Sequence, residues 1–142
     1  MSSGWQGFDF CECKEGQVGF ARQLSDEHRR MIGDRVKRVQ LVQLGIGTVG
    51  GEVIEQVIRH RATWRQYFGV DIAVSAVIGR EGALVAAEPS GFCDSELQDI
   101  VAGRRAGTSL SQGRNSLSDP KIAIERVAER GTTIVMDAAA GD

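Results

Sequence analysis

Three glycines, Gly45, Gly47 and Gly50, constrain the fold of this chain more than any other feature. They follow an apolar run at 39–44 that predicts a strand, and they precede apolar residues at helical spacing from 49 to about 61. Three glycines alone would be weak evidence for a nucleotide site. A Gly-x-Gly-x-x-Gly sequence between a strand and a helix is much stronger evidence, and it predicts a dinucleotide-binding α/β domain.

Each glycine of this turn has a physical role in such a domain. Gly45 permits the sharp turn, Gly47 lets the backbone approach a pyrophosphate, and Gly50 lets the helix pack closely on the strand. The helix would then present unpaired N–H groups and its positive dipole end to the phosphates, with the Thr48 hydroxyl as a further donor. The candidate cofactor-binding residues of the turn are Gly45, Ile46, Gly47, Thr48, Val49 and Gly50. A tight turn that binds nothing is the alternative interpretation.

Further along the chain, strands and helices are predicted to alternate. Strands are expected at 70–79 and 132–137, a helix at 94–103 capped by Asp94 or Ser95, and a helix that starts with Asp119 and Pro120. The last helix is expected to turn Ile124, Val127 and Ala128 inward and to end at Gly131. This alternation predicts an α/β fold, namely a Rossmann-like parallel sheet with flanking helices, partial, at about half of a doubly wound domain.

The domain organisation follows from the same pattern. Residues 1–38 are predicted to form an N-terminal extension with a short helix, and 39–142 an incomplete NAD(P)-binding Rossmann-like domain. Half a sheet leaves an apolar edge open, and such an edge needs a cover. We therefore expect either a homo-oligomer or a missing downstream domain.

Composition excludes several classes of function. The 17 Lys and Arg residues nearly balance the 19 Asp and Glu residues, so the net charge of -2 gives no case for nucleic acid or an anionic membrane as partner. No apolar run approaches the roughly 18 residues of a membrane span, and the start of the chain lacks a secretory signal, so a cytoplasmic location is expected.

The cysteines predict neither a disulfide framework nor a metal site. Their number, three, is odd, and Cys93 is expected to be a free thiol. Cys11 and Cys13 are separated by one residue, which is tighter than the usual zinc spacing, and no second Cys/His pair accompanies them.

The residues after the second strand bear on the choice of cofactor. Arg80 is suited to a ribose 2′-phosphate, which favours NADP, whereas Glu81 keeps NAD as the runner-up. Asp71 lies about twenty residues after the glycines but would open the second strand at the wrong end of the sheet, so we set it aside. A solvated loop charge is the alternative interpretation of Arg80.

Three segments resemble the N-terminal nucleotide-binding domain of homoserine dehydrogenase: "LGIGTVGGEVIEQVIRH", "VDIAVSAVIGREGALV" and "IVMDAAAGD". The family's fingerprint commonly reads G-x-G-x-V-G, which this chain matches, and the likeness covers 39–142. Asp137 with Ala138, Ala139 and Ala140 resembles the family's segment beside the nicotinamide ribose, with alanine in place of the usual Thr or Ser. The resemblance therefore adds these three alanines, through their backbone, to the cofactor-binding residues.

The resemblance also implies an activity. Enzymes of that family reduce L-aspartate 4-semialdehyde to L-homoserine with a nicotinamide cofactor, and their catalytic lysine and acidic residues lie in a downstream substrate domain. No catalytic residue is therefore assigned to this chain, which by itself is expected to be inactive. The alternatives are a related dehydrogenase of the aspartate dehydrogenase type, a stand-alone NADP(H)-binding sensor or regulatory module, and an interaction protein that has lost the site.

Overall fold

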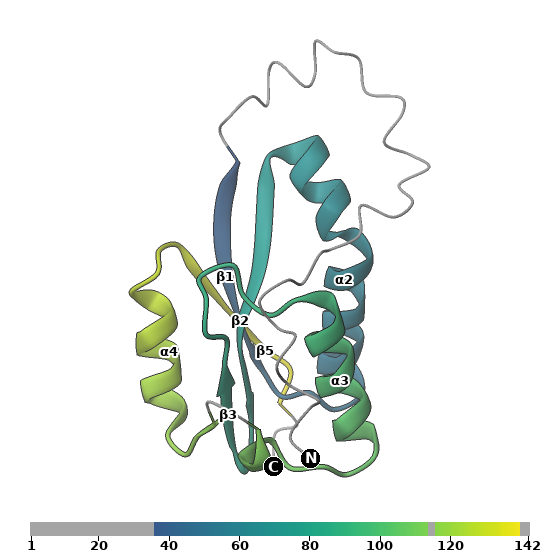
Figure 1. Cartoon of the computed structure of the whole chain (residues 1–142), viewed down its shortest axis with the longest axis vertical. Coiled ribbons are helices and arrows are strands. Elements are labelled where there is room, and N and C mark those ends of the chain that lie inside the picture. The colour runs from purple at the N-terminus through teal and green to yellow at the C-terminus, as the bar shows by residue number, and fades with distance from the viewer. Residues whose placement is uncertain (1–35, 114–115, 140–142) are drawn as a thin grey trace, which may run out of the picture.

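A computed structural model of the chain, which describes residues 36–113 and 116–139, contains a five-stranded mixed sheet with helices on both faces (Figure 1). The strand order is β4-β3-β2-β1-β5. The elements in chain order are β1 (Lys37–Leu44), α2 (Thr48–Phe68), β2 (Val70–Gly79), β3 (Gly82–Val85), α3 (Asp94–Arg105), the 3₁₀ turn η2 (Leu110–Gln112), β4 (Ser116–Leu117), α4 (Pro120–Ala128) and β5 (Thr133–Asp137). The predicted α/β class, a partial Rossmann-like sheet, is confirmed. The predicted N-terminal helix, Cys11, Cys13 and Ala140 lie outside the described residues.

The three strands expected from the sequence form the parallel centre of the sheet. β1 lies between β2 and β5 and runs parallel to both. Its residues from Val39 to Gln43 are all buried, because helices cover both faces of the sheet here. The parallel arrangement brings the carboxyl ends of β1, β2 and β5 to one edge of the sheet, where the glycine turn begins.

The other two strands were not expected. After β2 the chain reverses through Arg80 and Glu81, and β3 returns antiparallel to β2. The two-residue β4 then pairs antiparallel with β3. Neither strand carries a usable signal, since four and two residues are too few to show a period. The expectation of a largely parallel sheet therefore holds for the central strands β2, β1 and β5 and not for the side of the sheet formed by β3 and β4.

One face of the sheet is covered by α2 and α3 (Figure 1). Ile54 and Val57 of α2 and Leu97 and Val101 of α3 are buried together in one apolar cluster on this face. α2 continues to Phe68, about two turns beyond the expected end, and stops at Gly69 in the left-handed conformation (φ 63°). Val49, the first apolar residue of the helical spacing in the sequence, does not join the buried face of this helix, because its side chain is 65% exposed.

The N-terminus of α3 is capped one residue earlier than expected. Cys93, rather than Asp94 or Ser95, is the N-cap, and its N–H donates to Oε2 of Glu96 at 2.8 Å in a capping box. The sulfur of Cys93 also takes part in a disulfide bond, so the expectation of a free thiol is wrong.

The opposite face of the sheet is covered by α4 (Figure 1). As expected, Asp119 caps this helix, accepting from the N–H of Lys121 at 2.8 Å, and Pro120 is its first residue. The inward face is formed by Ala123 and Val127, both fully buried, with other small and β-branched side chains of the sheet. Ile124 is partly buried, but Ala128 is exposed, so its expected inward position is wrong.

Candidate functional site

The glycine turn lies where the ends of three strands meet. The N–H of Gly45 donates to the carbonyl of Ile78 in β2 at 2.7 Å, and the N–H of Ala138, just after β5, donates to the carbonyl of Leu44 at 2.8 Å. Gly45 has φ of 76°, and a Cβ there would lie 2.7 Å from the carbonyl oxygen of Ala138 and 2.8 Å from Cα of Ala139. Glycine is therefore required at position 45 by its conformation and by the close approach of the β5 end.

The remaining two glycines of the fingerprint differ sharply in what surrounds them. A Cβ at Gly50 would lie 1.9 Å from the carbonyl oxygen of Gly45, so packing of α2 against the turn excludes any side chain there. At Gly47 no atom of the described residues lies within 4 Å of an added Cβ, and φ is an ordinary -71°. The fold thus requires Gly45 and Gly50 but not Gly47, whose missing Cβ leaves space that faces outward.

The N-terminus of α2 carries the features of an anion site. Gly47 is its N-cap, and no side chain among the described residues caps the helix at this end. The first turn, which the structure describes completely, contains no acidic residue to offset the helix dipole. Thr48 and Val49 are exposed, and the N–H groups in the first turn of a helix have no partner within the helix, so both residues are available to a ligand. Ile46 is buried and can meet a ligand only through its backbone.

Arg80 and Glu81 lie at the same edge of the sheet as the glycine turn. They form the exposed turn between β2 and β3, two residues beyond the carbonyl that binds Gly45. Asp71 lies at the opposite edge, where its carboxylate pairs with Arg38 at 2.9 Å. The structure therefore brings Arg80 to the edge that sequence reasoning chose for it, and it supports setting Asp71 aside.

The segment after β5 adds backbone to the same edge. Ala138 and Ala139 follow β5 directly and face Gly45, and the N–H of Ala139 donates to Oδ1 of Asp137 at 2.9 Å. This short turn fixes the alanine segment beside the glycine turn. Of the three alanines assigned to the site, Ala140 is the one outside the described residues.

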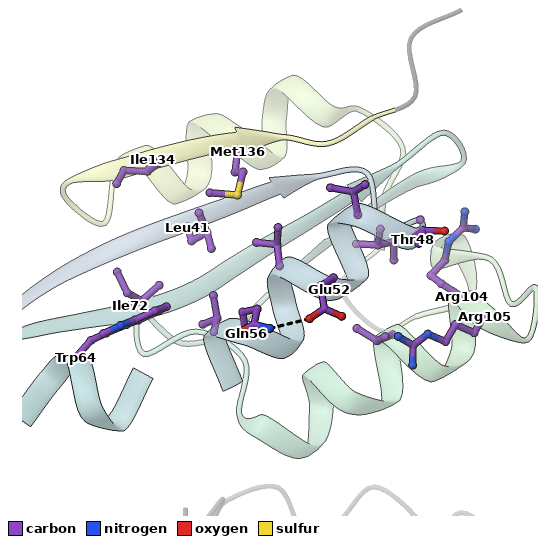
Figure 2. A pocket seen from close by; sticks show the side chains of 16 residues that line it. Leu41, Thr48, Glu52, Gln56, Trp64, Ile72, Arg104, Arg105, Ile134 and Met136 are labelled. Carbon is purple, nitrogen blue, oxygen red and sulfur yellow. Dashed lines mark hydrogen bonds between the residues drawn. The ribbon is translucent and has the colours of Figure 1, made fainter. Parts of the chain in front are cut away.

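A groove of about 910 Å³ starts at the glycine turn and runs along α2 toward β5 (Figure 2). Its polar end is formed by Gly47, Thr48, Glu52 and the arginines at the end of α3, Arg104 and Arg105. The rest is apolar and leads away from the strand ends; its main side chains are Leu41, Trp64, Ile72, Ile134 and Met136. Only the part of the polar end next to Gly47, Thr48 and Arg104 therefore belongs to the candidate dinucleotide site, because Arg105 is paired with Glu55 of α2.

Arg104 lines the polar end of this groove and is a candidate site residue that the sequence did not indicate. Figure 2 shows its side chain beside Thr48, although the two residues are far apart in the sequence. The helix expected from the sequence at 94–103 ends one residue before Arg104, whereas α3 continues to Arg105 and includes Arg104 in its last turn. The only local signal is a pair of arginines, which does not indicate what they face.

The part of the chain that the structure describes contains neither a candidate metal site nor a helix that could span a membrane. No cluster of three or more His, Cys, Asp or Glu side chains there is arranged to hold a metal ion. None of the helices in 36–113 and 116–139 has the length and apolar character needed to cross a membrane.

Comparisons with known protein families, curated proteins and solved structures found no match to this chain.

Proposed function

We propose that this chain binds a nicotinamide dinucleotide at the glycine turn and serves as the cofactor-binding part of an oxidoreductase. The observation that carries the proposal is the contrast among the three glycines. Gly45 and Gly50 are required by packing, whereas an added Cβ at Gly47 would meet nothing in the described protein. A glycine that the fold does not need, at the uncapped N-terminus of a helix, is accounted for by a diphosphate that approaches the backbone there.

NADP is proposed as the cofactor, with NAD as the runner-up. Arg80 lies at the end of β2, where a dinucleotide fold recognises the adenosine ribose, and its guanidinium suits a 2′-phosphate. Glu81, the other residue of the same turn, would instead suit a free 2′-hydroxyl. The proposed preference therefore depends on which of these neighbours faces the ribose.

The proposed reaction rests on the resemblance to homoserine dehydrogenase: reduction of L-aspartate 4-semialdehyde to L-homoserine. Hydride transfer is chemistry that the cofactor supplies when bound. This chain's own contribution is to hold the diphosphate at Gly47 and Thr48 and to set the ribose against the Ala138–Ala139 backbone. The groups that bind the substrate and give the oxygen its proton are assigned to no residue of this chain.

The test is calorimetric titration of the purified chain with NADPH and with NADH, using substitutions at two glycines that lie about one helical turn apart, Gly47 and Gly51. Gly47→Asp places a carboxylate in the phosphate position and caps α2, so we expect binding to be lost while folded stability is unchanged or slightly raised. Gly51→Ala is the matched control, because its Cβ would make only ordinary contacts, with a methyl of Val101 at 3.6 Å and the carbonyl oxygen of Ile46 at 3.9 Å. We expect this control to bind as the unaltered chain does.

The outcomes separate the candidate functions. If the chain binds NADPH more tightly than NADH, and Arg80→Ala abolishes this preference, the NADP assignment is supported. Tighter binding of NADH than of NADPH refutes it. If neither dinucleotide binds the folded chain, the proposal fails and a tight turn without a ligand is the better interpretation.

A further inference from the structure

The two arginines that end α3 have different surroundings. Arg105 forms an ion pair with Glu55 of α2, with Nη2 2.8 Å from Oε1. Arg104 makes no such pair among the described residues, and its Nε is a buried nitrogen without a hydrogen-bond partner there. Because no carboxylate among the described residues pairs with Arg104, which lines the groove, its positive charge is available to an anionic ligand there.

The position of Arg104 indicates where such a ligand would lie. Its half-buried side chain lines the polar end of the groove and, in Figure 2, lies beside Thr48 in the first turn of α2. Glu52 lines the groove one turn further into α2, and its Oε1 accepts from Nε2 of Gln56 at 2.7 Å. The side of the groove next to the helix N-terminus therefore carries the positive charge, and the acidic side chain lies deeper along the helix.

We propose that Arg104 binds the diphosphate of the dinucleotide, together with the N-terminus of α2. This inference rests on the proposed function and adds to it a ligand from a second helix. A guanidinium can donate two parallel hydrogen bonds to phosphate oxygens, which fixes orientation as well as charge. The diphosphate is chosen over the 2′-phosphate because Arg104 lies beside Thr48, whereas Arg80 occupies the end of β2.

The test compares three ligands on two matched variants. NADPH, NADH and ADP-ribose share the diphosphate, but only NADPH carries a 2′-phosphate. We expect Arg104→Met, which keeps the apolar stem of the side chain, to weaken all three by a similar factor of about ten to one hundred. Arg105→Met removes the same charge one residue away, where Glu55 is the partner, and we expect a change of less than about threefold.

A conservative substitution and a stability measurement complete the design. Arg104→Lys keeps the charge and loses the paired donors, so its affinity for ADP-ribose should lie between those of the unaltered chain and Arg104→Met. Thermal unfolding of each variant without ligand identifies any that binds poorly because it is misfolded.

Each other result contradicts a defined part of the reasoning. Equal affinities for Arg104→Met and Arg105→Met, with the unaltered chain binding normally, overturn the role of Arg104 and leave the proposed function standing. If Arg104→Met lowers the affinity for NADPH alone, Arg104 binds the 2′-phosphate rather than the diphosphate, and the diphosphate assignment is overturned. If the unaltered folded chain binds none of the three ligands, the proposed function itself fails, and the inference fails with it.

Discussion

Alanine substitutions at two adjacent glycines of α2 should have opposite effects on stability. A Cβ at Gly50 would lie 1.9 Å from the carbonyl oxygen of Gly45 and 2.7 Å from its carbon. Both atoms are backbone in a turn that is hydrogen-bonded to the end of β2, so neither can move aside without disturbing the sheet edge. At Gly51 the nearest atoms are a methyl of Val101 at 3.6 Å and the carbonyl of Ile46 at 3.9 Å, which are ordinary contacts.

The expected magnitudes follow from two opposing effects. Alanine in a helix is favoured over glycine by about 0.5–1 kcal/mol, and Gly51→Ala should gain this amount. Gly50→Ala gains the same preference but forces an overlap with rigid backbone, a kind of overpacking that costs about 1–3 kcal/mol or more. We therefore expect the two variants to differ by about 3 kcal/mol in the free energy of unfolding.

Urea denaturation followed by circular dichroism measures this difference directly, and thermal unfolding checks it. In a domain of this size a difference of 3 kcal/mol corresponds to roughly 10 °C in Tm. The refuting result is a Gly50→Ala variant as stable as Gly51→Ala. The close approach of α2 to the glycine turn, and with it the assignment of Gly50 to packing rather than to ligand binding, would then be wrong.

Three further substitutions test other parts of the structure. Ser75→Ala removes the buried hydroxyl that donates to Oε1 of Gln40, and urea denaturation should show a loss of about 1–3 kcal/mol; no loss would exclude this bond. Arg130→Met removes donors to the carbonyls of Ala86 (2.7 Å) and Glu88 (3.2 Å), so the same measurement should show a loss of about 1–2 kcal/mol, and an unchanged midpoint would contradict it. Ile134→Glu should change stability by less than about 0.5 kcal/mol, because the side chain is 49% exposed. Sedimentation should show it to disrupt any self-association through β5; an oligomer that persists would mean that this edge is not its interface.

The exposed apolar side chains of β5 are the structural reason to expect a partner. Ile134, Val135 and Met136 are 49%, 45% and 39% exposed, and the strand pairs only with β1 among the described strands. A parallel strand with apolar side chains exposed on both faces is unusual at the edge of a sheet. Whether a second copy or further chain covers it stays a prediction that the sedimentation measurement addresses.

Several elements could be predicted because their causes are local in the sequence. The Asp119 cap and Pro120 at the start of α4 require only that an oxygen acceptor and a residue of fixed φ stand next to each other. The strand, glycine turn and helix at 39–61 are specified by a change of apolar period and by glycines at the change. The order of these elements then makes the parallel centre of the sheet nearly unavoidable.

Other features were decided by contacts between distant residues. The β2–β3 hairpin forms because Ala83 and Val85 fill space beneath α4, and four residues show no pattern that reveals this in advance. Ala128 is exposed and Ala123 is buried because the packing of α4 on the sheet sets the rotation of the helix about its axis. The spacing of apolar residues in the sequence defines this rotation only to within about one residue.

The candidate site divides in the same way. The sequence by itself determined the glycine fingerprint and its position between strand and helix, since backbone conformation depends on neighbouring residues. The tertiary structure alone decided that Gly47 has free space where Gly50 has none, and that Arg104 lies beside Thr48. Free space and proximity depend on how α2 and α3 pack on the sheet, and packing joins residues whose separation along the chain carries no signal.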